Sequence, residues 1–285
     1  MDKVIGLGRL GCAIAEELTA YPEYRIYKID VDITERASLS FPKFKDMQQY
    51  EEGIDADEVS LYLRTIKEGD ECLIVVEGGT AISGAVLRVI EAIKGAKVNV
   101  LYIAPDRSVS TEIQKRDDKI AFMVLQEYAR SGAIESIVLI SKPAVEILAG
   151  EASIKNYEKN MSYFISYVVA MINYYNHTEA IVSTESTVAT HRRITTIGVS
   201  SLEEKATVNL LFPLQEISDV MFYYGIPDSD VDDDPTLMKK IKEQVKSYRT
   251  EDNMSVSFAV YPIELESPVV LCTAYSSVIQ DFAPS

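Results

Sequence analysis

The sequence has few or none of several residue types on which particular classes of protein depend. Its 285 residues include no tryptophan, two histidines and three cysteines, and 28 basic residues stand against 44 acidic ones. His177 and His191 do not combine with the scattered cysteines into the spacing of a zinc site. The net charge of −16 argues against binding to nucleic acid or to an anionic membrane by electrostatic attraction alone.

The cysteines are far apart, and each lies in an apolar stretch: Cys12, Cys72 and Cys272. This placement indicates buried free thiols in a reducing compartment. The first residues run directly into a predicted strand, so we expect no signal peptide, and no apolar run approaches the ~20 residues that span a membrane. We therefore expect a cytoplasmic protein with no membrane span.

One glycine-rich stretch stands out. An apolar run, 72–76, ends at the loop Gly78-Gly79-Thr80-Ala81-Ile82-Ser83-Gly84, and the helix predicted after it places Val86, Val89, Ile90 and Ile93 on one face. A strand, a glycine-rich loop and a helix in this order aim backbone N–H groups at a phosphate, because glycine permits close approach and the helix N-terminus is partially positive.

A second unit of this kind lies at the N-terminus. A strand is predicted over Lys3–Leu7, followed by Gly6-Leu7-Gly8-Arg9-Leu10-Gly11, a helix over Ala13–Leu18 and a strand over Arg25–Val31. Asp30 follows the last glycine by about 20 residues, as in a dinucleotide-binding fingerprint. The pattern therefore fits a phosphate-binding loop, and it also fits an NAD(P)-binding oxidoreductase.

The rest of the first ~145 residues alternates strands and helices, which predicts a mostly parallel sheet covered on both faces. Residues 38–53 are expected to be irregular, and Pro143 is expected in the first turn of a helix. Further elements are predicted as helices over 56–66 and 112–131, the latter with Gly132 as its C-cap and Ile113, Ile120, Met123, Val124 and Tyr128 on its apolar side, and strands over 97–103 and 136–140.

The second half has a different texture. A long apolar helix is predicted over 156–175. After it we predict strands over 191–199 and 205–212, helices over 214–224 and 235–248, an acidic loop over 228–234, and strands over 254–262 and 268–276 of the kind that pair antiparallel. This organisation predicts a nucleotide-binding domain, 1–152, a central core helix with its following loop, 153–182, and an α+β domain, 183–285.

This order of parts resembles the tubulin and FtsZ superfamily, and several motifs carry the resemblance. Residues 8–14 look like the first phosphate loop, and residues 78–84 align without a gap with the signature Gly-Gly-Gly-Thr-Gly-Ser/Thr-Gly. Residues 112–116 are similar to the family's Glu-x-x-x-Arg run, and residues 176–181 occupy the place of its catalytic Asn-x-Asp-x-x-Asp loop. The resemblance implies an α/β fold with a parallel-sheet domain, a long core helix and a smaller α+β domain.

The resemblance also implies a function: binding of GTP or GDP and head-to-tail assembly into a homopolymeric filament. Glu179 is the candidate for activating water in a neighbour's site, and magnesium would accompany the phosphates near Asp30 or Asp32. The implied nucleotide contacts are the backbone amides of Gly8, Gly11 and Cys12 around the phosphates, Gly78, Gly79, Ser83 and Gly84 around the distal phosphates, Glu112 and Arg116 on the sugar, and Asn160 on the base.

Two departures from the signature affect this expectation. Ala81 replaces the signature threonine and Ile82 replaces a glycine, which places a β-branched side chain where backbone would touch the ligand. These changes put tight triphosphate binding in question. Thr178 and Ile181 stand where the family's loop has its catalytic carboxylates, so we expect GTP hydrolysis to be weak or lost. A structural protein of the same fold that no longer binds nucleotide is the other alternative.

Overall fold

The computed structural model describes residues 1–35, 37–184, 193–203, 207–248 and 254–282. The chain forms two compact units, one covering Met1–Tyr167 and the other beginning at Val168. The boundary between them falls inside the long helix α7 (Tyr157–Asn176). No helix in these ranges combines the length and the apolar character that crossing a bilayer requires.

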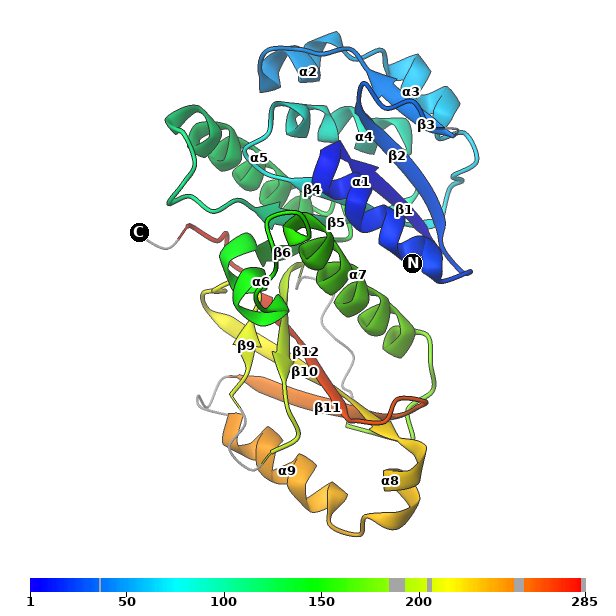
Figure 1. Cartoon of the computed structure of the whole chain (residues 1–285), viewed down its shortest axis with the longest axis vertical. Helices are drawn as coiled ribbons and strands as arrows, with labels where there is room; N and C mark the ends of the chain where they lie inside the picture. The colour runs from blue at the N-terminus through cyan, green and yellow to red at the C-terminus, as the bar shows by residue number, and fades with distance from the viewer. Residues whose placement is uncertain (36, 185–192, 204–206, 249–253, 283–285) are drawn as a thin grey trace. The chain divides into compact units, whose positions relative to one another are not determined.

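The first unit is built on parallel strands in the order β3-β2-β1-β4-β5-β6 (Figure 1). β1 is buried along its whole length and β4 along all but its end residues, the pattern of central strands covered on both faces. The strands are β1 (Lys3–Leu7), β2 (Arg25–Val31), β3 (Ser38–Phe41), β4 (Glu71–Glu77), β5 (Lys97–Ala104) and β6 (Ser136–Ser141).

Helices connect these strands, and most predicted elements of this unit are confirmed. The helix over 112–131 has the predicted bounds, Gly132 ends it in a left-handed conformation at φ 82°, and Pro143 lies in the first turn of α6. The first helix begins at Gly8, five residues before the predicted start. The helices are α1 (Gly8–Glu17), α2 (Met47–Gly53), α3 (Ala56–Tyr62), α4 (Val86–Ala92), α5 (Glu112–Ser131) and α6 (Lys142–Ala149), with 3₁₀ helices at Leu18–Ala20 and Ala81–Ala85.

The prediction that residues 38–53 are irregular is wrong. Ser38–Phe41 forms β3, which pairs with β2 at the edge of the sheet. Asp46 starts α2, because its carboxylate accepts a hydrogen bond from the Gln49 N–H at 2.9 Å. Pro42 and the scattered charges thus lie between two short elements. Pairing with β2 stabilises β3, and the Asp46 cap stabilises α2.

The prediction of which residues form the buried side of α5 is also wrong. Ile113 and Ile120 are 63% and 44% exposed. The buried face instead carries two aspartates together with small and apolar residues, because both carboxylates have cationic partners. The buried residues of α5 are Asp117, Asp118, Ala121, Phe122, Leu125, Gln126 and Ala129.

The second unit has strands in the order β8-β12-β10-β11-β7, with β9 beside β8. β10 pairs parallel to β11 and antiparallel to β12, and the other pairings are antiparallel. The strands are β7 (Val182–Ser183), β8 (Ile194–Ser200), β9 (Asn209–Leu210), β10 (Ile217–Pro227), β11 (Ser255–Ile263) and β12 (Val269–Ser276), and the helices are α8 (Asp228–Asp233) and α9 (Leu237–Tyr248).

Several predictions for this unit are wrong, and two of them concern the sheet. The segment 214–224 is not helical, because its β-branched and aromatic residues form β10, which has a partner on each side. β11 and β12 are strands as predicted, but each pairs with β10 and not with the other.

The acidic stretch 228–234, predicted as a loop, forms α8 over most of its length. Of the strand predicted over 205–212, only Asn209–Leu210 forms a strand, and residues 207–208 and 211–212 do not. Residues 191–192, which include His191, and residues 205–206 lie outside the described residues.

Candidate functional site

The carboxyl ends of four neighbouring strands meet at one edge of the parallel sheet. Leu7 at the end of β1 lies opposite Val76 in β4, and Val76 lies opposite Tyr102 in β5. Because parallel strands end on the same side, the segments that leave β1, β4, β5 and β6 come together there. Ligands of open α/β sheets bind at this edge.

The first segment begins α1 without a side-chain cap. Gly8 has φ 75°, a conformation that favours glycine, and Leu7 at the N-cap makes no side-chain hydrogen bond to the helix. The first-turn N–H groups have no acceptor within the helix, and no acidic residue lies among them. This helix end has the geometry and the partial charge to bind an anion.

Gly11 and Cys12 face the protein interior. A Cβ at Gly11 would lie 2.4 Å from the Val75 carbonyl oxygen, so the glycine lets α1 pack directly on β4. Cys12 is buried, and its thiol donates to the Gly6 carbonyl oxygen at 3.3 Å. Burial raises the pKa of Cys12 to about 12, so this side chain is neither charged nor directed at a ligand.

The second segment, after β4, is partly occupied by its own contacts. Gly79 has φ 70°, like Gly8, whereas the Gly78 N–H continues the sheet by donating to the Ile103 carbonyl oxygen at 2.9 Å. Ser83 is 1% exposed, and its hydroxyl donates to the Thr80 carbonyl oxygen at 2.7 Å. In this conformation the Ser83 hydroxyl, expected on a phosphate, is directed inward.

The two glycine segments lie against each other. A Cβ at Gly8 would lie 2.8 Å from Ile82 Cγ2, and the Ile82 side chain is only 8% exposed. The structure therefore brings the two predicted phosphate loops together, and it also places an aliphatic side chain in the space between them.

A buried carboxylate lies directly beneath the second loop, and the sequence analysis did not find it. Asp118 in α5 is fully buried and accepts hydrogen bonds from the Tyr102 hydroxyl at 2.7 Å and from Arg107 Nη1 at 2.8 Å. A Cβ at Gly78 would lie 2.0 Å from that hydroxyl and 2.5 Å from Asp118 Oδ1. The network thus supports the loop from below, and adjacent aspartates in a long helix were its only signal in the sequence.

Two ion pairs link these segments to the helices that follow β6. Arg9, in the first turn of α1, pairs with Glu158 at the start of α7. Glu77, which precedes Gly78, pairs with Lys142 at the start of α6, and both side chains are mostly buried. The starts of α1, α6 and α7 and the loop after β4 therefore belong to one site.

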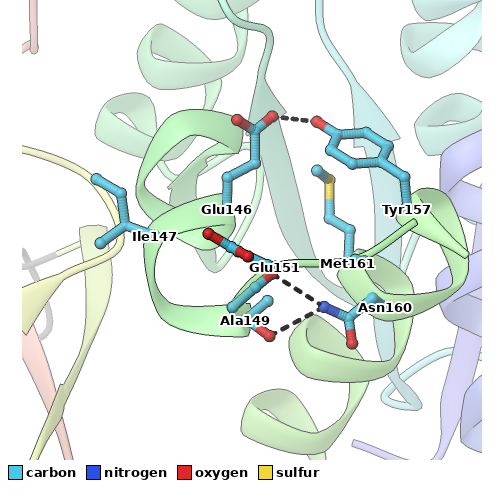
Figure 2. Close-up of a pocket in the computed structure, with 9 residues that line it drawn as sticks. Glu146, Ile147, Ala149, Glu151, Tyr157, Asn160 and Met161 are labelled. Carbon is cyan, nitrogen blue, oxygen red and sulfur yellow. Dashed lines mark hydrogen bonds between the residues drawn. The ribbon is translucent and has the colours of Figure 1, made fainter. Parts of the chain in front are cut away.

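A pocket of about 500 Å³ lies between the end of α6 and the start of α7. Figure 2 shows that Asn160 directs its amide nitrogen at the last turn of α6, where it donates to the Ala149 carbonyl oxygen at 2.9 Å. The Tyr157 hydroxyl donates to Glu146 across the same pocket. Asn160, predicted to contact a base, thus lines a pocket while its amide group fixes the turn.

The remaining predicted residues lie at the surface. Glu112 pairs with Lys115 at 2.9 Å and Arg116 with Asp117 at 2.7 Å, and the Glu112 and Arg116 side chains are 89% and 61% exposed. Glu179 is exposed in the second unit, just after the end of α7.

Metal-binding geometry is not evident at the positions proposed for magnesium. Burial raises the pKa of Asp30, and its carboxylate accepts from the Val31 N–H at 2.8 Å. Across the described ranges, no three His, Cys, Asp or Glu side chains are grouped as a metal site.

Comparisons with known proteins identify the fold. No sequence profile of a protein family matches the chain. No curated protein matches it either. Among solved structures, the chain is similar to the empty FtsZ dimer of M. jannaschii, with 15% identity over 96% of this chain and 87% of that one and a TM-score of 0.73.

The chain is also similar to the GDP-bound monomer of CetZ1 from Haloferax volcanii, with 16% identity and a TM-score of 0.72. The match covers 98% of this chain and 94% of CetZ1. A third similar structure is a GTPγS-form protofilament of TubZ from Bacillus thuringiensis serovar israelensis, with 13% identity and a TM-score of 0.70. The match covers 97% of this chain and 87% of that one. The chain therefore has the tubulin/FtsZ fold, as its sequence motifs predicted, and the similarity extends over nearly its whole length.

Proposed function

We propose that this chain is a guanine-nucleotide-binding, filament-forming protein of the tubulin/FtsZ type, with weak or no GTP hydrolysis. The observation that carries the proposal is the convergence of two glycine segments on the uncapped start of α1. Gly8 and Gly79 both have positive φ there, at the edge of a parallel sheet where anions bind.

Backbone groups would provide most of the phosphate contacts. The N–H groups at the start of α1, from Gly8 to Leu10, have no intrahelical acceptor and are the primary phosphate ligands of this proposal. Gly79 and the start of the 3₁₀ helix at Ala81 would supply the second set. The roles predicted for Gly11 and Cys12 are then mainly structural, because their backbone N–H groups lie past the first helical residues and have acceptors within α1. The same holds for Gly78, Ser83 and Gly84, whose polar groups or surfaces are engaged within the protein.

The pocket beside Asn160 is the proposed place of the base. The Asn160 amide nitrogen is engaged by the end of α6, which leaves Oδ1 without a donor among the described residues and free to accept from a base N–H. Guanine presents such donors at N1 and N2. Glu112 and Arg116 remain the proposed sugar contacts, since their exposed side chains can leave their partners at little cost.

The relatives support assembly as well as binding. The similar structures include an FtsZ dimer, a TubZ protofilament and a TubZ two-stranded filament, at 13–15% identity. A head-to-tail contact joins two different surfaces of the same chain and therefore builds an open filament. Glu179 would act in this contact as the carboxylate that positions water in a neighbour's site, and any bound magnesium would be held mainly by phosphate oxygens.

Nucleotide binding is tested first by calorimetric titration of the purified, nucleotide-stripped protein with GDP, ATP and NADH. We expect binding of GDP and no comparable binding of the other two. Binding of NADH alone would support an oxidoreductase, and binding of none would leave a structural protein of the same fold.

Assembly and hydrolysis are tested with the native chain and two matched variants, Glu179→Gln and Glu266→Gln, which both alter exposed glutamates. Light scattering and negative-stain electron microscopy report filaments, and phosphate release reports hydrolysis. We expect filaments in all three proteins and any phosphate release to be reduced only by Glu179→Gln. Absence of polymer with every nucleotide would contradict the assembly proposal.

A further inference from the structure

We infer that the site accepts a guanine nucleotide with a short phosphate chain, and that Ile82 is the residue that discriminates against the third phosphate. The inference rests on the proposed function and concerns which nucleotide the same site prefers. It follows from the packing of Ile82, the support behind it and the charges around it.

Ile82 lies between the two loops, in the space that a phosphate in contact with both loops would need. Its Cγ2 lies so close to Gly8 that a Cβ there would be only 2.8 Å away, and the side chain is 92% buried. A group that contacts both the start of α1 and the loop after β4 must share this space. A first or second phosphate held only by the start of α1 need not enter it.

The loop cannot easily move Ile82 aside, because α2 packs behind it. A Cβ at Gly84 would lie 2.1 Å from the Met47 carbonyl oxygen, so helix α2 touches the loop backbone directly. Ser83 is held by its hydroxyl and its N–H, which both donate to the Thr80 carbonyl oxygen, at 2.7 and 3.1 Å. Retreat of Ile82 would therefore require these contacts to break.

The charges of the site favour the same conclusion. Three basic residues at this sheet edge already have a carboxylate partner, in the pairs Arg9–Glu158, Lys142–Glu77 and Arg107–Asp118. The third phosphate adds negative charge next to these carboxylates, and neutralising it would require an existing pair to open. A diphosphate adds less negative charge at this position and therefore does not require an existing ion pair to open.

The test is a calorimetric comparison of GDP and the non-hydrolysable analogue GMPPNP, with magnesium, on the native protein and three variants. Ile82→Ala removes most of the side chain and Ile82→Val removes one methyl group. Ile90→Ala is the matched control, since Ile90 is 9% exposed in the following helix and has no contact of this kind with Gly8. Circular dichroism verifies that each variant is folded.

We expect the native protein to bind GDP at least about tenfold more tightly than GMPPNP, the loss expected when a buried aliphatic side chain must be displaced. Ile82→Ala is expected to remove most of this preference by tightening GMPPNP binding, and Ile82→Val is expected to reduce it less. Ile90→Ala should leave the ratio of the two affinities unchanged.

The outcomes separate this inference from the function on which it rests. Equal native affinities for the two nucleotides, or an Ile82→Ala change that affects both equally, would overturn the role of Ile82 and leave nucleotide binding intact. If neither the native protein nor any variant binds either nucleotide, the proposed function fails and this inference fails with it.

Discussion

The buried carboxylate of Asp118 leads to a quantitative prediction about stability. Asp118→Ala removes the carboxylate that accepts from the fully buried Tyr102 hydroxyl at 2.7 Å and forms an ion pair with the 30% exposed Arg107 at 2.8 Å. The Tyr102 hydroxyl keeps its second acceptor, the backbone carbonyl oxygen of residue 118 at 3.0 Å, so the lost ion pair is the main cost. Removal of one member of a buried, hydrogen-bonded ion pair costs about 3–5 kcal/mol. For a folding unit of this size, that loss lowers the melting temperature by about 6–20 °C.

The neighbouring aspartate provides the control. Asp117 is nearly as buried, but its partner Arg116 is 61% exposed and water can solvate it when the carboxylate is removed. We therefore expect Asp117→Ala to cost about 1 kcal/mol or less. Chemical denaturation and differential scanning calorimetry measure both variants. If Asp118→Ala loses no more stability than Asp117→Ala, the interpretation of the Tyr102–Asp118–Arg107 network is wrong.

The pH dependence gives a second measure of the same group. Burial raises the pKa of Asp118 above its ordinary value of 3.8, although Tyr102 and Arg107 oppose the shift. A carboxyl group whose pKa is higher in the folded state contributes most to stability at low pH, and this contribution falls as pH rises through the folded pKa. The stability advantage of the native protein over Asp118→Asn should therefore narrow as pH rises from below 3.8 towards neutrality.

Three further predictions concern other parts of the chain. Gly11→Ala should destabilise the first unit by several kcal/mol or prevent its folding, because the new Cβ would lie 2.4 Å from the Val75 carbonyl oxygen. Gly69→Ala is the comparison for expression and thermal unfolding: it has open space around its Cβ, and its φ of 83° should cost only about 1–2 kcal/mol. Burial raises the pKa of each of the three cysteines to about 12, so they should react with a thiol reagent far more slowly in the native than in the denatured protein. Rapid labelling of the native protein would contradict their burial. Hydrogen bonds from Thr236 and then Lys240 lower the pKa of Asp234 to about 2, so the stabilisation from this carboxylate should be present above pH 3.8 and lost as pH falls towards 2. A stability difference between the native protein and Asp234→Asn that stays constant over this range would be inconsistent with these hydrogen bonds.

Local sequence patterns were sufficient to predict much of the fold. The bounds of α5, its glycine cap and the central strands follow from the spacing of apolar residues and from turn chemistry, which act between neighbours in the sequence. The errors occurred where a distant partner decided the outcome. Residues 217–227 form strand β10 because they pair with β11 and β12, and residues 38–41 form β3 because they pair with β2 at the edge of the sheet.

The same division holds for the candidate site. Glycine spacing and apolar runs can be recognised without coordinates, and they predicted two glycine segments that each follow a buried strand. The contact of Ile82 with Gly8, the inward direction of Ser83 and the place of Asp118 beneath Gly78 could not be predicted from local spacing. Those contacts depend on strand order and on the rotation of α5 about its axis, and two buried aspartates fixed that rotation against the helix's apolar periodicity.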